Sequence, residues 1–196
     1  MTERSILAGK SPQIVIHAGG DVLVKGWDSE RVLAESSGIW GLQIKRKNGV
    51  IEVQIGGSGQ ALVPFDSSVK VYSGKSSEIQ EIRGVVSAVA GLDVRISQSN
   101  VLAQASAGKA MDIDCRVTEG PELKLTAGWH LRCWLRDVKN VKYLIDDLGG
   151  KWQTVLGDGS VVIHLKAGGD VTLVTDQPVT GLSPDGLMGK VVAPGQ

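Results

Sequence analysis

The chain is predicted to be all-β: a single-stranded parallel β-solenoid, or β-helix, with coils of about 20 residues. Apolar and polar residues alternate in many short segments, which is the period of strands with one buried face. A small residue followed by glycine recurs about every 20 residues. Glycine makes up 26 of 196 residues, well above the usual share of about 7%, whereas aromatic residues make up only 4%. Many tight turns around an aliphatic core are therefore expected.

The first coil is expected near the N-terminus, because residues 14–24 (IVIHAGGDVLV) are similar to residues 161–174 (VVIHLKAGGDVTLV). Both segments carry a histidine, then a glycine pair, an aspartate and a valine. The similarity predicts equivalent coils at the two ends of a stack.

The next part of the chain, residues 39–65, is predicted to form two strands across the turn Lys47-Asn48-Gly49. Asn-Gly is a strong signal for a tight hairpin. Residues 67–74 (SSVKVYSG) then return to the strand pattern. The early repeats are longer and less regular than the later ones, which indicates loops inserted on one side of the stack.

In the second half, alternating segments lie on both sides of each glycine, so one repeat holds at least two short strands. The segments before the glycines are 84–91, 101–108, 122–128, 141–150 and 161–169, and those after them are 92–97, 111–117, 131–136, 151–156 and 171–176. Only residues 76–91 and 137–150 could instead be helices, and their valine and isoleucine content favours strands.

Stacking is expected because one such repeat cannot bury its own apolar face. Alignment on the glycines predicts two inward columns of side chains. The first comprises Val94, Ile113, Cys133, Thr154 and Leu173, and the second comprises Ile96, Cys115, Leu135 and Leu156. The alternative is an antiparallel β-sandwich or barrel with hairpins at similar spacing.

The glycine-punctuated strands, with VLVKGWD at 22–28 and AGGDVTLVTD at 167–176, carry a family resemblance over residues 12–176. The chain resembles the bacterial putative-adhesin β-solenoid family of unknown function and, more faintly, the bactofilins. The resemblance implies a β-helical stack that serves as a surface, scaffold or polymer-forming module, without catalytic residues. The chain departs from a secreted adhesin in lacking a leader, and from the compact bactofilin core in its irregular residues 30–65.

Residues 1–11 are predicted to form an N-terminal cap or arm, residues 12–178 the solenoid domain, and residues 179–196 a C-terminal tail. No signal peptide and no transmembrane segment is visible. The cytoplasm is therefore the expected location, with the cell surface as the alternative if a leader is missing.

Charge and motifs argue against several classes of site. The formal net charge is zero, so no overall field would attract nucleic acid or an anionic membrane. Cys115 and Cys133 are predicted to be small core residues, and His17, His130 and His164 lack metal-ligand spacing. Because the sequence contains no phosphate-binding loop and no GxSxG elbow, the chain is predicted not to be an enzyme and not to bind a cofactor.

The candidate binding residues are Trp129, Trp134 and Trp152, which could face outward as a strip for a glycan or a protein. The alternative for these side chains is packing in the core or at corners. Asp112 and Asp114 share one strand face and could serve a catalytic or calcium site, but solvated strand faces also carry aspartate.

The preferred functional prediction is a non-catalytic structural scaffold that self-associates through the open strand edges at its ends. The alternative is an adhesin-like module that binds a glycan or a protein. A β-helical carbohydrate-active enzyme is the third hypothesis.

Overall fold

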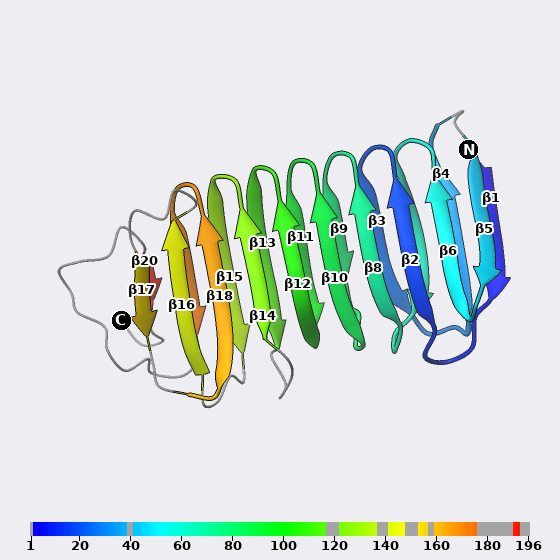
Figure 1. Ribbon diagram of the computed structural model, residues 1–196. Coiled ribbons are helices and arrows are strands. Elements are labelled where there is room, and N and C mark those ends of the chain that lie inside the picture. The colour runs from blue at the N-terminus through cyan, green and yellow to red at the C-terminus, as the bar shows by residue number, and fades with distance from the viewer. Residues whose placement is uncertain are drawn as a thin grey trace.

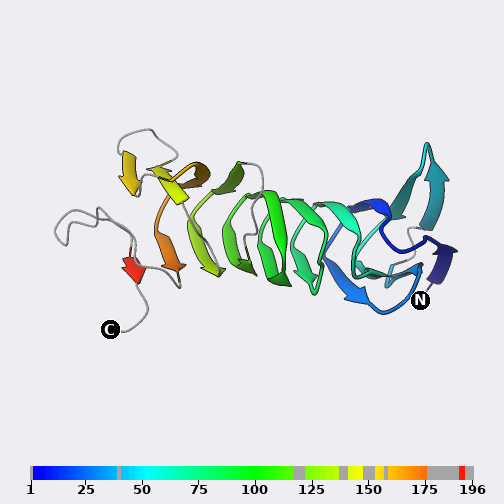
Figure 2. The same ribbon diagram turned by 90° about the horizontal axis from the view of Figure 1, so that it is seen from below.

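The computed structural model describes residues 2–38, 41–116, 122–136, 141–147, 153–156, 159–175 and 190–192. Their regular elements are all strands, in two 10-stranded sheets that form an elongated sandwich (Figures 1 and 2). Among these residues there is no helix long and apolar enough to cross a membrane.

The first sheet, sheet A, runs along the molecule from β1 at one end to β20 at the other. In spatial order its strands are β1 (Thr2–Leu7), β4 (Arg31–Ser36), β7 (Gly59–Pro64), β3 (Val22–Trp27), β9 (Ser77–Gln80), β11 (Val94–Ser99), β13 (Ala110–Arg116), β15 (His130–Arg136), β19 (Val171–Thr175) and β20 (Lys190–Val192).

The second sheet, sheet B, packs against sheet A. In spatial order its strands are β17 (Gln153–Leu156), β16 (Val141–Asp147), β18 (Val161–Ala167), β14 (Leu123–Ala127), β12 (Val101–Ala107), β10 (Val85–Ala90), β8 (Ser68–Ser73), β2 (Gln13–Ala18), β6 (Val50–Ile55) and β5 (Leu42–Lys47).

Through most of the molecule the chain passes from a strand of sheet B across a tight turn to a strand of sheet A, and we call each such pair a coil. The pairs β8–β9, β10–β11, β12–β13 and β14–β15 are successive coils, and their strands pair in parallel with those of the neighbouring coils. The alternating burial along each strand follows from this arrangement, because one face of each sheet meets the other sheet.

Both ends depart from this regular order. Strand β2 lies between β6 and β8, which both come later in the chain, and β18 lies between β14 and β16, which both come earlier (Figure 1). Beyond each inserted strand sheet B ends in an antiparallel hairpin, β5–β6 at one end and β16–β17 at the other. The two similar segments of the sequence therefore occupy corresponding positions, each third from its end of sheet B.

The prediction of an all-β chain is confirmed, but the prediction of a single-stranded solenoid whose strands all pair in parallel is wrong. Both sheets are mixed, because β1, β4, β5 and β17 pair antiparallel. A coil at the end of a stack has a neighbour on one side only, and a hairpin can cover its open edge locally. The alternative of two sheets packed as a sandwich fits better, although it assumed antiparallel strands throughout and the central ones are parallel.

The recurring small residue and glycine mark the corner where sheet B turns toward sheet A. Each backbone N–H of the corner glycines donates to a carbonyl of the preceding coil, as from Gly91 to Ser73 at 3.1 Å and from Gly108 to Ala90 at 3.1 Å. A Cβ on Gly108 would meet the carbonyl oxygen of Gly91 closer than 3.0 Å, and Gly74, Gly91 and Gly128 are crowded in the same way. Glycine is therefore required here by close backbone approach.

The core is aliphatic, as expected, but the predicted columns need correction. The true registers are Val94–Met111–Leu131–Val171, Ile96–Ile113–Cys133–Leu173 and Ser99–Cys115–Leu135–Thr175. The predicted columns placed Val94 and Ile96 one inward position out of register. Val94, Met111 and Leu131 each lie three residues after their corner glycines, so a constant offset from the glycine gives the observed register. Thr154 and Leu156 belong to β17 in sheet B and not to a column of sheet A.

Several local predictions are confirmed. Strands β5 and β6 form a hairpin across Asn48 and Gly49, which both have positive φ, at 52° and 80°. The segments that could have been helices contain β9, β10 and β16. The domain boundaries remain predictions, with residues 2–7 in β1 and residues 190–192 in β20 at the edges of sheet A.

Candidate binding face on sheet A

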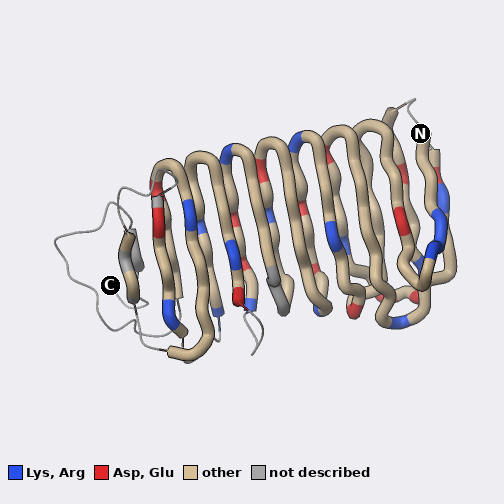
Figure 3. The backbone as a smooth tube through the Cα atoms, viewed as in Figure 1, with Lys and Arg blue, Asp and Glu red and all other residues tan. Residues whose placement is uncertain are grey.

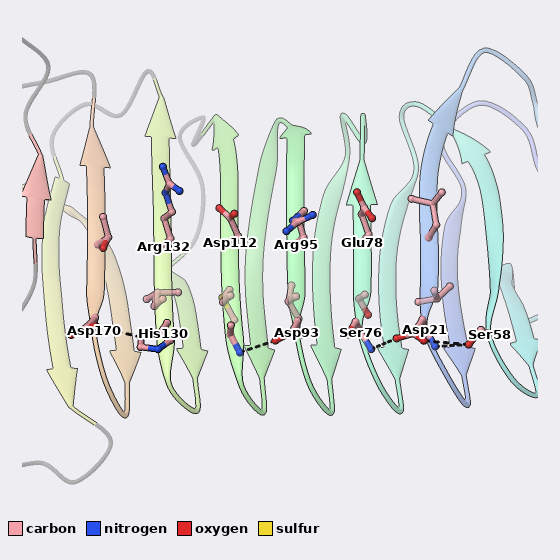
Figure 4. A pocket seen from close by; sticks show the side chains of 18 of the residues that line it. Asp21, Ser58, Ser76, Glu78, Asp93, Arg95, Asp112, His130, Arg132 and Asp170 are labelled. Carbon is pink, nitrogen blue, oxygen red and sulfur yellow. Dashed lines mark hydrogen bonds and ion pairs between the residues drawn. The ribbon is translucent and has the colours of Figure 1, made fainter.

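The outer face of sheet A carries two parallel rows of polar side chains that run along the long axis (Figure 4). The first row, the corner row, lies just before each strand or at its first residue, and includes Asp21, Ser76, Asp93, His130 and Asp170. The second row lies two residues further along each strand. These positions follow from the register, since every second residue of a strand points away from the core.

The corner row links neighbouring coils. The Asp21 carboxylate accepts a hydrogen bond from the Ser76 N–H at 3.1 Å, and the Asp93 carboxylate accepts one from the Ala110 N–H at 3.2 Å. At the other end of the row, the His130 Nδ1 lies 3.4 Å from the Asp170 carboxylate. Asp21 and Asp93 therefore satisfy backbone donors at the corner, whereas Asp170 contacts the His130 side chain.

The second row, which we call the charge ladder, comprises Glu78, Arg95, Asp112 and Arg132. They lie side by side on β9, β11, β13 and β15, as the registers Glu78–Arg95, Arg95–Asp112 and Asp112–Arg132 show. Acidic and basic residues alternate along it at the spacing of neighbouring strands, about 4.8 Å. The three members after Glu78 are exposed, and Glu78 is half-buried and accepts a hydrogen bond from Gln80 at 2.7 Å.

Between the two rows runs a shallow trough of about 820 Å³, and the residues of the two rows that line it lie on six neighbouring coils, from β3 to β19. Its lining residues include the corner row, the charge ladder and, towards its ends, Leu23 and Thr172. Opposite charges are also interspersed along the rest of the described chain, except for the basic positions of β5 at one end (Figure 3).

The three tryptophans predicted as a binding strip are only partly described. Trp129 lies at the turn before β15 and is 65% exposed, and Trp134 points outward from β15 and is 44% exposed. Both are near the trough, but their rings contact different neighbours: Trp129 lies edge-on to His130 at 5.8 Å, and Arg136 stacks over Trp134 at 4.6 Å. Trp152 lies outside the described residues, so the strip remains a prediction.

Beside the ladder, Asp114 binds Arg136. The Arg136 guanidinium donates to the Asp114 carboxylate at 2.8 Å while it covers the Trp134 ring. Asp112 and Asp114 therefore have different surroundings on the same strand face. Of the residues described, no group of three or more histidine, cysteine or acidic side chains could hold a metal ion.

The histidines of the two similar coils are far apart, as predicted, since four strands of sheet B separate β2 from β18. His17 stacks on Tyr72 at 5.0 Å, and His164 lies 2.6 Å from the Glu122 carboxylate. The pKa of Glu122 is lowered, mainly by its hydrogen bond with Lys124 and further by His164. Each histidine thus has a local structural contact of its own.

The prediction of core thiols is confirmed. Cys115 and Cys133 are free and buried on the inner face of sheet A. Burial, together with the nearby Asp114 charge, raises the pKa of Cys115 to about 12. The pKa of Cys133 is raised well above its usual value, first by burial and then by Cys115, Asp112 and Asp114. Neither thiol would be ionised near neutral pH, so neither is suited to act as a nucleophile.

Sequence reasoning missed the charge ladder, although its members were visible. Glu78, Arg95 and Asp112 follow one another at 17-residue intervals, and Arg132 comes 20 residues later. The unequal interval is absorbed outside the paired strands, between β13 and β14, so a search at one fixed period would not have aligned the four residues.

No protein-family model matches the sequence, and no curated protein matches it. Among solved structures, the chain is similar to a "putative cell adhesion protein" from Clostridium sporogenes ATCC 15579. The two share 11% sequence identity with a TM-score of 0.48, over 90% of this chain and 99% of the other. This distant structural similarity is the only support among the comparisons for the predicted resemblance to adhesins. No comparison supports the fainter likeness to bactofilins.

Proposed function

We propose that this protein is a non-catalytic binding module that presents the outer face of sheet A to another protein. The observation that carries the proposal is the trough of about 820 Å³ between the corner row and the charge ladder. Its charged groups are spread along roughly 24 Å, five strand spacings, instead of converging on one point. That arrangement suits an extended partner surface better than a small substrate.

The alternation of charge along the ladder favours a protein as the partner. A nucleic acid or an acidic glycan presents charges of one sign, and it would meet Asp112 between the two arginines and Glu78 on the other side of Arg95. A protein surface can offer both signs at matching positions, which gives register and specificity. The exposed Trp129 and Trp134 at the β15 end of the trough add the kind of aromatic surface that protein interfaces favour.

The scaffold hypothesis, with association through the ends, receives less support. At the β5 edge of sheet B, three successive basic residues, Lys45, Arg46 and Lys47, lie on the outermost strand. Charged edge strands oppose pairing with another chain. Arg46 also donates to the Leu7 carbonyl at 2.6 Å, which ties this edge to the end of β1. End-to-end assembly therefore stays a prediction.

Site-specific photo-crosslinking in the cells that make the protein would test the proposal. A photoreactive residue at Thr172, in the trough, should give a discrete adduct with a protein. The matched control is Thr126, which is also half-buried but lies on the outer face of sheet B. An adduct from Thr126 alone, or none from either position, would refute the choice of sheet A.

A further inference from the structure

The charge ladder has a property that goes beyond a general binding face: it is complementary to itself when reversed. Read along the long axis, its signs are negative, positive, negative and positive at Glu78, Arg95, Asp112 and Arg132. The same row read from the other end has every sign inverted. We propose that the partner is a second copy of this chain, docked face to face on sheet A, and this inference rests on the proposed function.

Symmetry decides how the two copies must lie. A two-fold axis that relates two stacked faces lies in the plane between them. If it ran along the long axis of the molecule, each residue of the ladder would face its own equivalent, and like charges would meet. If it runs parallel to the strands, between β11 and β13, the order of strands in the second copy is reversed.

In that arrangement Arg95 faces Asp112 of the second copy, and Glu78 faces Arg132 of the second copy. Symmetry repeats both contacts, which gives four opposite-charge contacts. Moving the axis by one strand spacing replaces these four contacts by only two opposite-charge contacts. Moving it by half a spacing sets like charges opposite each other. The ladder therefore specifies one register.

The groups needed for these contacts are available. Arg95, Asp112 and Arg132 are exposed, and within the described part of the chain none of the three lies within 4.0 Å of an opposite charge. The neighbouring Arg136, by contrast, is bound to Asp114. The ladder charges can thus pair across an interface without first breaking an ion pair within the chain.

The residues on either side of the ladder also determine how tight the complex can be. In the same arrangement Trp134 faces Gln80 of the second copy, and His130 faces Ser76 of the second copy. At the rim Asp21 faces Asp170 of the second copy, where solvent screens the repulsion. The face that the six coils offer measures roughly 24 Å by 17 Å, below the standard interface of about 800 Å² per partner. We therefore expect a weak, concentration-dependent dimer that salt dissociates.

Charge-swap complementation tests the proposal, with sedimentation velocity at low ionic strength as the measurement on the purified chain. Arg95→Glu sets an acidic side chain against Asp112 twice per dimer, and Asp112→Arg sets a basic side chain against Arg95 twice. Each single variant should weaken self-association by roughly a hundredfold. An equimolar mixture of the two should recover it, because each repulsive contact becomes attractive in the mixed dimer.

The double variant Arg95→Glu/Asp112→Arg should dimerise like the unchanged chain, and Lys70→Glu, on the outer face of sheet B, is the matched control. Circular dichroism of each variant verifies folding, and the double variant keeps the test decisive if a single variant fails to fold. A monomer at every concentration, or single variants that do not complement each other, would overturn the homodimer. If the crosslink at Thr172 then gave an adduct with a different protein, the binding module would stand and only the identity of the partner would be wrong.

Discussion

The corner glycines allow the sharpest test of how the coils are held together, through the substitution Gly108→Ala. The added methyl group would meet the Gly91 carbonyl of the preceding coil at less than 3.0 Å, and that atom is backbone, which cannot rotate away. The two coils would have to separate at the corner. This would strain the hydrogen bonds from the Gly108 N–H to Ala90 at 3.1 Å and from the Lys109 N–H to Leu92 at 2.8 Å.

The magnitude follows from these contacts. Overpacking costs about 1–3 kcal/mol, and each weakened hydrogen bond adds about 0.5–1.5 kcal/mol. We expect Gly108→Ala to lower the free energy of unfolding by about 3 kcal/mol, which for a chain of this size is a fall in Tm of roughly 6–12 °C. Thermal and urea unfolding followed by circular dichroism would measure both quantities.

The control is Gly57→Ala, at a glycine where an added Cβ meets nothing within 4 Å and φ is not in the left-handed region. This change should be neutral, or stabilising by about 0.4–1 kcal/mol, because it reduces the entropy of the unfolded chain. Equal stability of the two variants would refute the reasoning, since it would mean that close packing of the corner carbonyls does not require glycine.

Three further predictions concern the core, the corner and the end of the molecule. The Cys115 thiol should resist alkylation in the folded protein, because its pKa is raised to about 12. The stability that this thiol contributes is fully present below its unfolded pKa near 9 and is lost as the pH rises toward 12. Urea titrations should show this loss as about 1.4 kcal/mol per pH unit. Asp93→Ala removes the acceptor of the Ala110 N–H and should cost about 1 kcal/mol in urea unfolding, whereas Asp93→Asn, which keeps an acceptor oxygen, should cost less; equal losses would contradict the role of that hydrogen bond. Arg46→Ala frees the Leu7 carbonyl and should raise the rate of amide hydrogen exchange in β1, with little effect on the central coils. An unchanged exchange rate in β1 would show that Arg46 does not hold this strand.

Most of the local structure could be predicted from the sequence because it depends on neighbouring residues. The alternation along residues 130–136 is the alternation observed in β15, with Cys133 inside and Trp134 outside. The Asn48-Gly49 turn follows from the backbone conformations that these two residues tolerate. The small residue and glycine at each corner, and the burial of both thiols, were likewise predictable.

The candidate binding face was predicted only in part. An outward strip was one of two alternatives for Trp129 and Trp134, the other being packing in the core or at corners. Both side chains are exposed, but each contacts a different neighbour. The charge ladder was not predicted, because it depends on which outward residues of different coils become neighbours. An error of two residues in the expected register, as at Val94, is enough to hide such a row.

The sequence by itself determined that the chain folds into short strands with one aliphatic face, joined by glycine corners, because these features follow from side-chain period and backbone sterics. Only the tertiary structure decided the order of the coils, with β2 between β6 and β8 and β18 between β14 and β16. The physical reason is that every coil presents a similar aliphatic interior and similar open hydrogen-bonding edges, so local pattern does not distinguish one neighbour from another. The choice depends on the packing of the whole stack, and that choice also places Glu78, Arg95, Asp112 and Arg132 in one row.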